Sequence, residues 1–303
     1  MSLPSHDPGK SHPSGCSEAA PTTVRSPQEG TAAVPAAFTF DLAALSDVGS
    51  ERSNNEDACG SHVESTVHAL VVVADGVGGY EGGELASRTA VDVTLATYRD
   101  SPVAWGAPKR LYRAVQQANI EIYDRAIVVP ELRHMATTIV AAAVDRGVLY
   151  AAHVGDSRLY LIRDGRIRQL TKDHTIVAER ARLGLIGRER AREHPERSTL
   201  TRSVGPELIV AIDKLTTTLV QGDTLVLCTD GLYNVLGDEQ LQSLVGDLGA
   251  EAACRALIDA ANARGTIDNI TAGVFRMTGT TPPLENVGGL RGRLRKLFGS
   301  SRR

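Results

Sequence analysis

The chain has 303 residues, of which 42% are hydrophobic and 23% are charged, and its formal net charge is −3. This length suits one large domain or two small ones, with a core that needs no disulfides. The longest apolar runs, such as the one at 69–74, are too short to cross a bilayer, and no basic-then-apolar stretch opens the chain. The sequence therefore predicts neither a transmembrane segment nor a secretory signal, and its charge balance argues against a nucleic-acid partner.

The charge is distributed unevenly. Residues 1–37 carry two basic and three acidic side chains, whereas residues 281–303 carry six basic and one acidic. The residues between them therefore have a net charge of −7. Six of the thirteen prolines fall in 1–37 with almost no large apolar residue, which predicts a disordered N-terminal tail.

The patterns between the tails predict one α+β domain over residues 38–279. In chain order, the expected elements are strands at 38–45 and 69–74, helices at 81–99 and 111–126, strands at 137–144, 148–154, 158–163, 167–170, 209–212 and 225–228, helices at 238–248 and 250–263, and a strand at 270–277. Short links rich in Asp and Gly require antiparallel pairing of the middle strands. Residues 173–198, which are rich in Arg and Glu, form an excursion from the sheet.

Four acidic residues occupy the same kind of position, at the edge of an apolar run. Asp75, Asp156 and Asp230 each adjoin a glycine, and Asp268 precedes the final strand. A turn explains any single Asp-Gly pair, but four such sites favour a shared role. Carboxylates brought together raise one another's pKa, and a hard divalent cation relieves that repulsion. Oxygen-only ligands suit Mg²⁺ or Mn²⁺, while the cysteines form neither a CxxC pair for zinc nor a Cys-x5-Arg phosphatase motif.

These motifs, in this order, resemble the metal-dependent protein serine/threonine phosphatases of type 2C (the PPM family) in their compact bacterial form. The matching segments run from residue 46 to residue 277. They include RSNNED at 52–57, VADGVGG at 73–79, ATT at 136–138, HVGDSR at 153–158, LTKDH at 170–174, CTDGL at 228–232 and DNIT at 268–271. Each segment alone is weak evidence, but their joint order and spacing are specific.

The resemblance implies an αββα sandwich of two antiparallel sheets flanked by helix pairs, with two Mn²⁺ or Mg²⁺ ions at one edge. By motif, Asp75 bridges the two ions and the Gly76 carbonyl holds one of them. Asp230 and Asp268 hold the other ion, and Asp156 holds a third, weaker ion that shares Asp230.

The resemblance also implies roles in the reaction. Asp57 and Glu56 act mainly through metal-bound water, and Arg52 binds the substrate phosphate. Phosphoserine and phosphothreonine in proteins are then hydrolysed by a metal-bridging hydroxide, without a phosphoenzyme. The implied catalytic residues are Arg52, Asp57, Asp75, Asp230 and Asp268.

Two features of the motifs leave questions open. Val77 stands where some eukaryotic members have a histidine that resembles a general acid, and we interpret His153 as a satisfied core histidine rather than its replacement. The 173–198 excursion matches the flap beside the family's active site. Its arginines, among them Arg180, Arg182 and Arg197, form either a solvated salt-bridged helix or a surface that selects acidic phosphoprotein segments.

The implied partners are phosphoprotein substrates and an opposing bacterial-type Ser/Thr kinase, with a cytoplasmic location. The basic C-terminal tail, 280–303, interleaves leucines with arginines, and it is a solvated tail, a partner-docking segment or a weak attachment to an anionic membrane surface. Two other functions stay open: a regulatory member that binds phosphoproteins without turnover, and a hydrolase of small phosphate esters.

Overall fold

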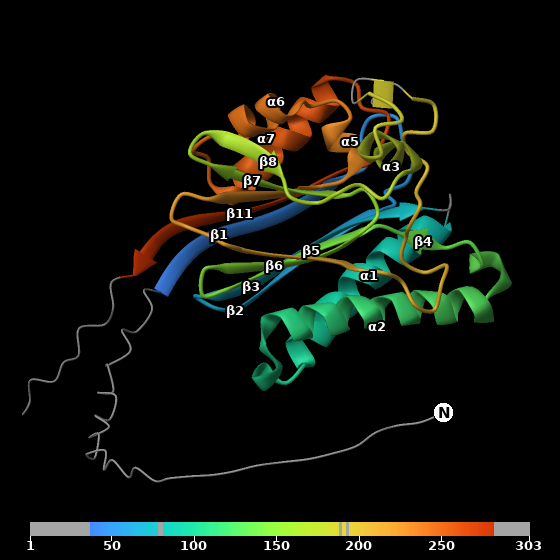
Figure 1. Cartoon of the computed structure of the whole chain (residues 1–303), viewed down its shortest axis with the longest axis horizontal. Helices are drawn as coiled ribbons and strands as arrows, with labels where there is room; N and C mark the ends of the chain where they lie inside the picture. The colour runs from blue at the N-terminus through green and yellow to red at the C-terminus, as the bar shows by residue number, and fades with distance from the viewer. Residues whose placement is uncertain (1–36, 78–80, 188–189, 192–193, 282–303) are drawn as a thin grey trace, which may run out of the picture. The chain divides into compact units, whose positions relative to one another are not determined.

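Two antiparallel β-sheets stack face to face in the computed structural model, which describes residues 37–77, 81–187, 190–191 and 194–281 (Figure 1). The first sheet has the order β1 (Ala37–Asp47), β11 (Ile270–Thr281), β10 (Thr224–Cys228), β7 (Arg158–Arg163) and β8 (Arg166–Gln169). The second has the order β2 (Asp57–Ser65), β3 (His68–Val77), β5 (Ile139–Asp145), β6 (Val148–Val154) and β9 (Asp213–Thr218). A short strand, β4 (Ala136–Thr137), pairs with the end of β3.

Helices cover the outer face of each sheet. The second sheet carries α1 (Glu81–Asp100) and α2 (Gly106–Val128), which are joined through the 3-10 turn η1 (Val103–Trp105), and η2 (Pro130–Leu132) follows α2. The first sheet carries α5 (Asp230–Tyr233), α6 (Asp238–Val245) and α7 (Ala250–Ala263). A further helix, α3 (Ile176–Arg182), lies in the segment between β8 and β9. The predicted αββα sandwich is confirmed.

Strand β3 shows why its sequence is apolar without alternation. Leu70, Val72 and Ala74 pack toward α1 and α2, whereas Val71 and Val73 pack between the sheets. Successive side chains of a strand point to opposite faces, so a strand covered on both faces must be apolar throughout. A third apolar cluster fills the space between the first sheet and α6 and α7.

The predicted strand at 209–212 is wrong. Residues 206–212 form bends and irregular backbone, because Asn119 of α2 donates hydrogen bonds to the carbonyls of Glu207 and Leu208, and Ile209 is 79% exposed. The strand here is β9, which begins at Asp213 and pairs with β6. Sequence analysis also missed β2, whose residues carry little apolar pattern.

The predictions for the two tails fall almost wholly on residues 1–36 and 282–303, which lie outside the described residues. Among the residues that the structure does describe, no helix is both long enough and apolar enough to span a membrane.

Candidate active site

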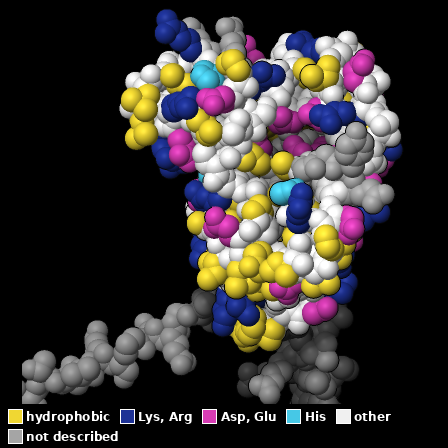
Figure 2. All heavy atoms as spheres, turned by 90° about the vertical axis from the view of Figure 1, so that its right-hand side faces the viewer, with side chains coloured by type: hydrophobic (Ala, Val, Ile, Leu, Met, Phe, Trp, Pro, Cys, Tyr) yellow, Lys and Arg dark blue, Asp and Glu magenta, His cyan; other side chains and the backbone are white. Residues whose placement is uncertain are grey.

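One end of the sandwich collects the predicted acidic residues. Asp57 lies opposite Asp75 in the register of β2 and β3, and Asp156 lies in the turn between β6 and β7. Asp230 opens α5 directly after β10, and Asp268 comes just before β11. Both sheets therefore contribute to a single acidic cluster, and Figure 2 shows acidic side chains gathered in a hollow on this face of the molecule.

The carboxylates of this cluster influence one another strongly. Burial, together with the charges of Asp230 and Asp268, raises the pKa of Asp57 to about 7. Burial, followed by the charge of Asp268, raises the pKa of Asp230 to about 6. Burial, followed by the charge of Asp230, raises the pKa of Asp156 to about 8. The pKa of Asp75 is raised by burial and then by the other four carboxylates. This mutual repulsion indicates that the five groups face a common space.

Hydroxyl groups hold Asp57 in place. Its Oδ2 accepts hydrogen bonds from the hydroxyls of Thr229, at 2.8 Å, and Thr271, at 2.7 Å. Both bonds oppose the effect of burial on the pKa of Asp57. Since Thr229 directly follows β10 and Thr271 lies in β11, the first sheet holds a carboxylate that belongs to the second.

The backbone of Asp75 is held in a similar way by two threonines. Its N–H donates to Thr138 Oγ1 at 3.0 Å, and its carbonyl accepts from Thr137 Oγ1 and from the Thr138 N–H, each at 2.8 Å. Thr138 Oγ1 also lies 2.6 Å from Ser157 Oγ, next to Asp156. The ATT motif at 136–138 therefore joins the strand end of Asp75 to the turn of Asp156, a role that the sequence did not predict.

Two glycines allow the backbone to approach closely. A Cβ on Gly76 would collide with the carbonyls of Gly83 and Glu56, and the Gly76 N–H donates to Glu56 O at 3.0 Å. A Cβ on Gly231 would collide with the carbonyl of Asn269. The Asp-Gly pairs are thus packing requirements at the site as well as turn signals.

Asn269 is a second residue whose role sequence analysis missed. Its side-chain oxygen accepts from the Glu56 N–H at 2.8 Å, and its amide donates to the carbonyls of Val48 and Asn54. These bonds hold the segment at 48–57 against the start of β11. Its only signal in the sequence was the position next to Asp268.

Arg52 lies at the cluster, as the sequence predicted, but it is engaged with protein groups. Its Nη2 pairs with Asp268 Oδ1 at 2.9 Å, and its Nε donates to Ile267 O at 3.1 Å. The Arg52 side chain is 46% exposed, so the guanidinium lies at the rim of the cluster. Glu56 lies beside Arg52. Burial raises the pKa of Glu56 above its ordinary value, and the charge of Arg52 only partly opposes this effect.

The predicted flap arginines are not brought into the cluster. Arg180 pairs with Glu196 at 2.7 Å, and Arg182 and Arg197 are exposed. These observations favour the salt-bridged surface over direct contact with the site. His153 is buried, as predicted, but neither of its ring nitrogens has a hydrogen-bond partner among the described residues, so it is not the satisfied core histidine that we expected. Val77 ends β3 and is 39% exposed.

The donor set fits a hard divalent cation. It consists of buried carboxylates and a glycine carbonyl, with raised carboxyl pKa values that bound positive charge would lower. Among the described residues, however, no three carboxylate, imidazole or thiol groups are already grouped as a metal cage. Arg52 holds Asp268, the threonines hold Asp57, and Asn234 donates to Asp230.

Comparison with known proteins identifies the family to which the chain belongs. The family model described as protein phosphatase 2C matches residues 49–246. The serine/threonine phosphatase Stp of Listeria innocua is 34% identical over 229 residues, covering 74% of this chain and 91% of that protein. The crystal structure of the Mycobacterium tuberculosis phosphatase PstP/Ppp superposes with a TM-score of 0.73 at 32% identity, covering 80% of this chain and all of that one.

A structure of the catalytic domain of PstP in complex with two manganese ions superposes with a TM-score of 0.72 at 30% identity, again covering 80% of this chain and all of that one. The chain belongs to the protein phosphatase 2C family. It is a protein serine/threonine phosphatase, a hydrolase of the class that uses Mn²⁺ or Mg²⁺.

Proposed function

We propose that this phosphatase hydrolyses phosphoserine and phosphothreonine in proteins at the acidic cluster, without a covalent phosphoenzyme. The observation that carries the proposal is that buried carboxylates from both sheets raise one another's pKa at one end of the sandwich. Keeping them together costs folding free energy, which is characteristic of a binding or catalytic site.

In this proposal Asp75, the Gly76 carbonyl, Asp230 and Asp268 would hold the catalytic cations. Asp156 contributes to a third, weaker site with Asp230. When bound, the cations supply Lewis acidity, which neutralises phosphoryl charge and makes water a stronger acid.

The chain's own groups do the remaining work. Arg52 presents a planar fork of N–H donors that matches two phosphate oxygens, and it stands at the rim where a phosphoprotein can reach it. The Thr229 and Thr271 hydroxyls fix Oδ2 of Asp57, so that this carboxylate has one orientation in which to hold water near the phosphate. Glu56 lies beside Arg52 and, like Asp57, holds water near the phosphate.

The substrates and partners follow from the enzyme class. We propose that an opposing bacterial-type Ser/Thr kinase and its targets are the physiological partners, and that the enzyme acts in the cytoplasm. Among the flap arginines, the exposed Arg182 and Arg197 then meet acidic segments of the substrate, while Arg180 stays paired with Glu196. The basic tail at 280–303 docks to a partner or to an anionic membrane surface. Phosphoproteomics of a deletion strain, with and without the kinase, tests the pairing.

Arg52→Lys tests the phosphate role. Lysine keeps the charge but loses the bidentate fork, so we expect KM for a phosphothreonine peptide to rise about tenfold, equivalent to about 1.4 kcal/mol. Arg113→Lys, at the other end of the sandwich, is the matched control and should leave KM unchanged. Equal KM values for the wild type and Arg52→Lys would contradict the role of Arg52. Comparable turnover of phosphotyrosine peptides would contradict the proposed specificity.

A further inference from the structure

His174 lies at the start of the flap segment 173–198, where it contacts the turn that bears Asp156. It immediately precedes Thr175, whose hydroxyl accepts from the Ala178 N–H and caps the N-terminus of α3. The flap root, defined here as Thr175, Ile176, Thr199 and Leu200, is closed by a bridge between Thr175 and Leu200 and by the Ile176 N–H donating to Thr199 O at 3.0 Å. The His174 carbonyl accepts from the Thr201 N–H at 2.8 Å, just beyond this root.

The opposite side of His174 holds the turn that bears Asp156. The His174 N–H donates to Gly155 O at 2.8 Å, and the Gly155 N–H donates to Nδ1 of the imidazole at 3.0 Å. Gly155 has φ of 105°, and a Cβ there would collide with Thr138, so the turn has little freedom of its own. His174 therefore contacts the residue that sets the direction of Asp156.

A third contact leaves the far side of the ring. Because Nδ1 accepts a hydrogen bond, the neutral ring carries its proton on Nε2, which lies 3.3 Å from Asp213 Oδ2. These two atoms lie within ion-pair distance, but their geometry is not that of a well-directed hydrogen bond. Asp213 also pairs with Arg202 at 2.8 Å, and Arg202 donates to Ala211 O at 2.8 Å.

The surroundings keep this ring neutral and fixed. His174 is 4% exposed and its ring centroid lies 4.7 Å from that of His153. Burial, followed by the charge of Arg202, lowers the pKa of His174. A buried ring with a hydrogen bond on one side and a carboxylate within ion-pair distance on the other is poorly placed to exchange protons with substrate, but it can set the relative position of two backbone segments.

We infer that His174 is a positioning residue for the phosphatase reaction: one ring nitrogen holds the Gly155–Asp156 turn, and the other is held by Asp213, so that this turn and α3 keep a fixed relation. The inference rests on the proposed function for its kinetic consequence. The Gly155 contact bears on the reacting end of the substrate, through Asp156. The Asp213 contact bears on the protein part of the substrate, because it fixes the His174 ring and His174 adjoins Thr175 of the flap root.

Two substitutions separate the contacts. In His174→Asn the amide oxygen can take the place of Nδ1 and accept from Gly155, but the contact with Asp213 is lost. In His174→Gln the longer amide can reach Asp213, but the Gly155 contact is lost. The substrates are a phosphothreonine peptide with acidic flanks and p-nitrophenyl phosphate, which is too small to span both the cluster and the flap.

We expect His174→Gln to lower kcat about tenfold on both substrates and to weaken Mn²⁺ binding in calorimetric titration. We expect His174→Asn to raise KM for the peptide at least threefold more than KM for p-nitrophenyl phosphate. Hydrogen exchange by mass spectrometry should rise at 153–158 in His174→Gln and at 175–182 in His174→Asn.

The inference is overturned if both variants lose kcat equally on both substrates with the same exchange pattern, since that result indicates a merely structural histidine. It is also overturned if both behave as the wild type. If the buried variants do not fold, Arg202→Gln replaces them, because it alters the surroundings of Asp213 from a partly exposed position. A raised KM for the peptide with kcat retained supports the inference, and an unchanged KM overturns it. An inactive wild type would count against the proposed function, whereas the exchange pattern tests the positioning role independently.

Discussion

Buried aspartates occur at both ends of the sandwich, but they have different partners. At the end away from the acidic cluster, Asp223 lies 1% exposed with Arg163 bound to both of its oxygens, and Asp145 pairs with Arg146. At the acidic cluster, Asp57 has threonine hydroxyls as partners instead of a cation. An aspartate that has its own arginine stabilises a turn, whereas aspartates gathered without enough cationic partners mark a site.

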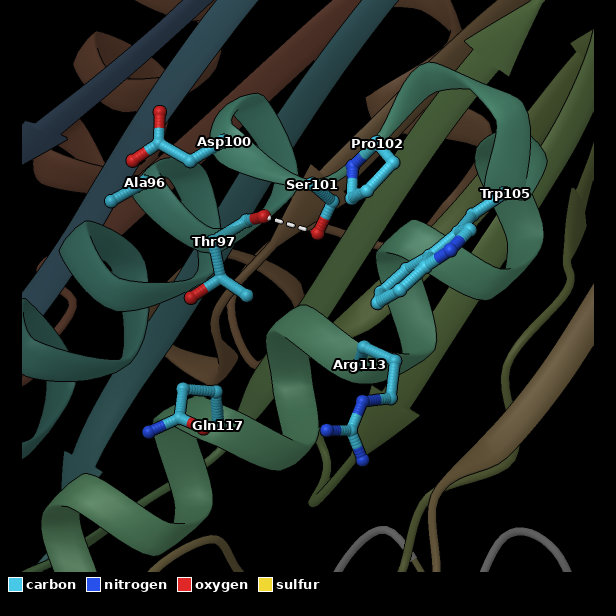
Figure 3. A pocket seen from close by; sticks show the side chains of 8 residues that line it. All are labelled: Ala96, Thr97, Asp100, Ser101, Pro102, Trp105, Arg113 and Gln117. Carbon is cyan, nitrogen blue, oxygen red and sulfur yellow. Dashed lines mark hydrogen bonds between the residues drawn. The ribbon is translucent and has the colours of Figure 1, made fainter.

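The end away from the cluster also contains a pocket. It has a volume of about 450 Å³ between the end of α1 and the start of α2, and its lining includes Thr97, Asp100, Trp105 and Arg113 (Figure 3). The pocket is mixed in polarity and open, and Arg99 pairs with its one aspartate. Because this pocket lies away from the acidic cluster, substitutions in it provide controls. Trp105, the chain's single tryptophan, reports on folding by fluorescence.

The largest expected difference between the two ends is in catalysis. Asp75→Asn removes a central carboxylate while keeping its volume, and we expect kcat/KM on a phosphothreonine peptide to fall at least about a hundredfold, because metal charge stabilisation is worth several kcal/mol. Asp145→Asn, the matched change at the other end, should cost stability but leave kcat/KM within about twofold. Equal losses in the two variants would remove the distinction between structural and functional aspartates.

The next effect is on stability and its pH dependence. In protein treated with EDTA, the pKa values of Asp230, Asp57 and Asp156, at about 6, 7 and 8, exceed the ordinary carboxyl value of 3.8. The folded chain therefore binds more protons than the unfolded chain between about pH 4 and pH 8, so the free energy of unfolding should fall as pH rises through this range. Denaturant titrations across this pH range measure the free energy of unfolding.

Added Mn²⁺ should reverse that loss, since it binds the ionised, folded site. Asp75→Asn should flatten the pH dependence in EDTA, because one of the interacting charges is gone. A free energy of unfolding that rises steadily between pH 5 and pH 8 in EDTA would contradict the electrostatic description of the cluster.

A smaller effect should follow from removing one supporting hydroxyl. Thr138→Val takes away the acceptor of the Asp75 N–H and the partner of Ser157, and we expect a loss of about 1–3 kcal/mol in stability, the usual cost of an unsatisfied buried polar group. Activity should fall several-fold as well. Thr94→Val is the control, since that buried hydroxyl has no hydrogen-bond partner in the part of the chain that the structure describes, and the change should cost no stability. Similar behaviour of the two variants in thermal unfolding and kinetics would show that Thr138 does not position Asp75.

Much of this arrangement was readable in the sequence. The apolar run at 69–74 predicted a strand that delivers Asp75 to the edge of a sheet, and the same reasoning placed Asp230 after β10. Resemblance of the motifs then predicted both sheets and the meeting of the carboxylates. Local patterns sufficed here because a run of buried residues followed by Asp-Gly constrains the backbone strongly.

The rest depended on contacts between distant segments. Thr138 and Thr271 touch the acidic residues from other strands, and Asn269 reaches back by more than two hundred positions to Asn54, so no local pattern reveals them. The predicted strand at 209–212 failed for a similar reason, since Asn119 binds the carbonyls of the preceding residues, Glu207 and Leu208.

The most direct test is hydrolysis of a phosphothreonine peptide before chelation, after EDTA treatment, and after Mn²⁺ or Mg²⁺ is restored. Phosphate release should be lost in EDTA and recovered with either cation in the wild type, while Asp230→Asn should recover little at the same concentration. Full activity in EDTA would contradict the account, because the buried carboxylates would then have no catalytic role that depends on a bound cation.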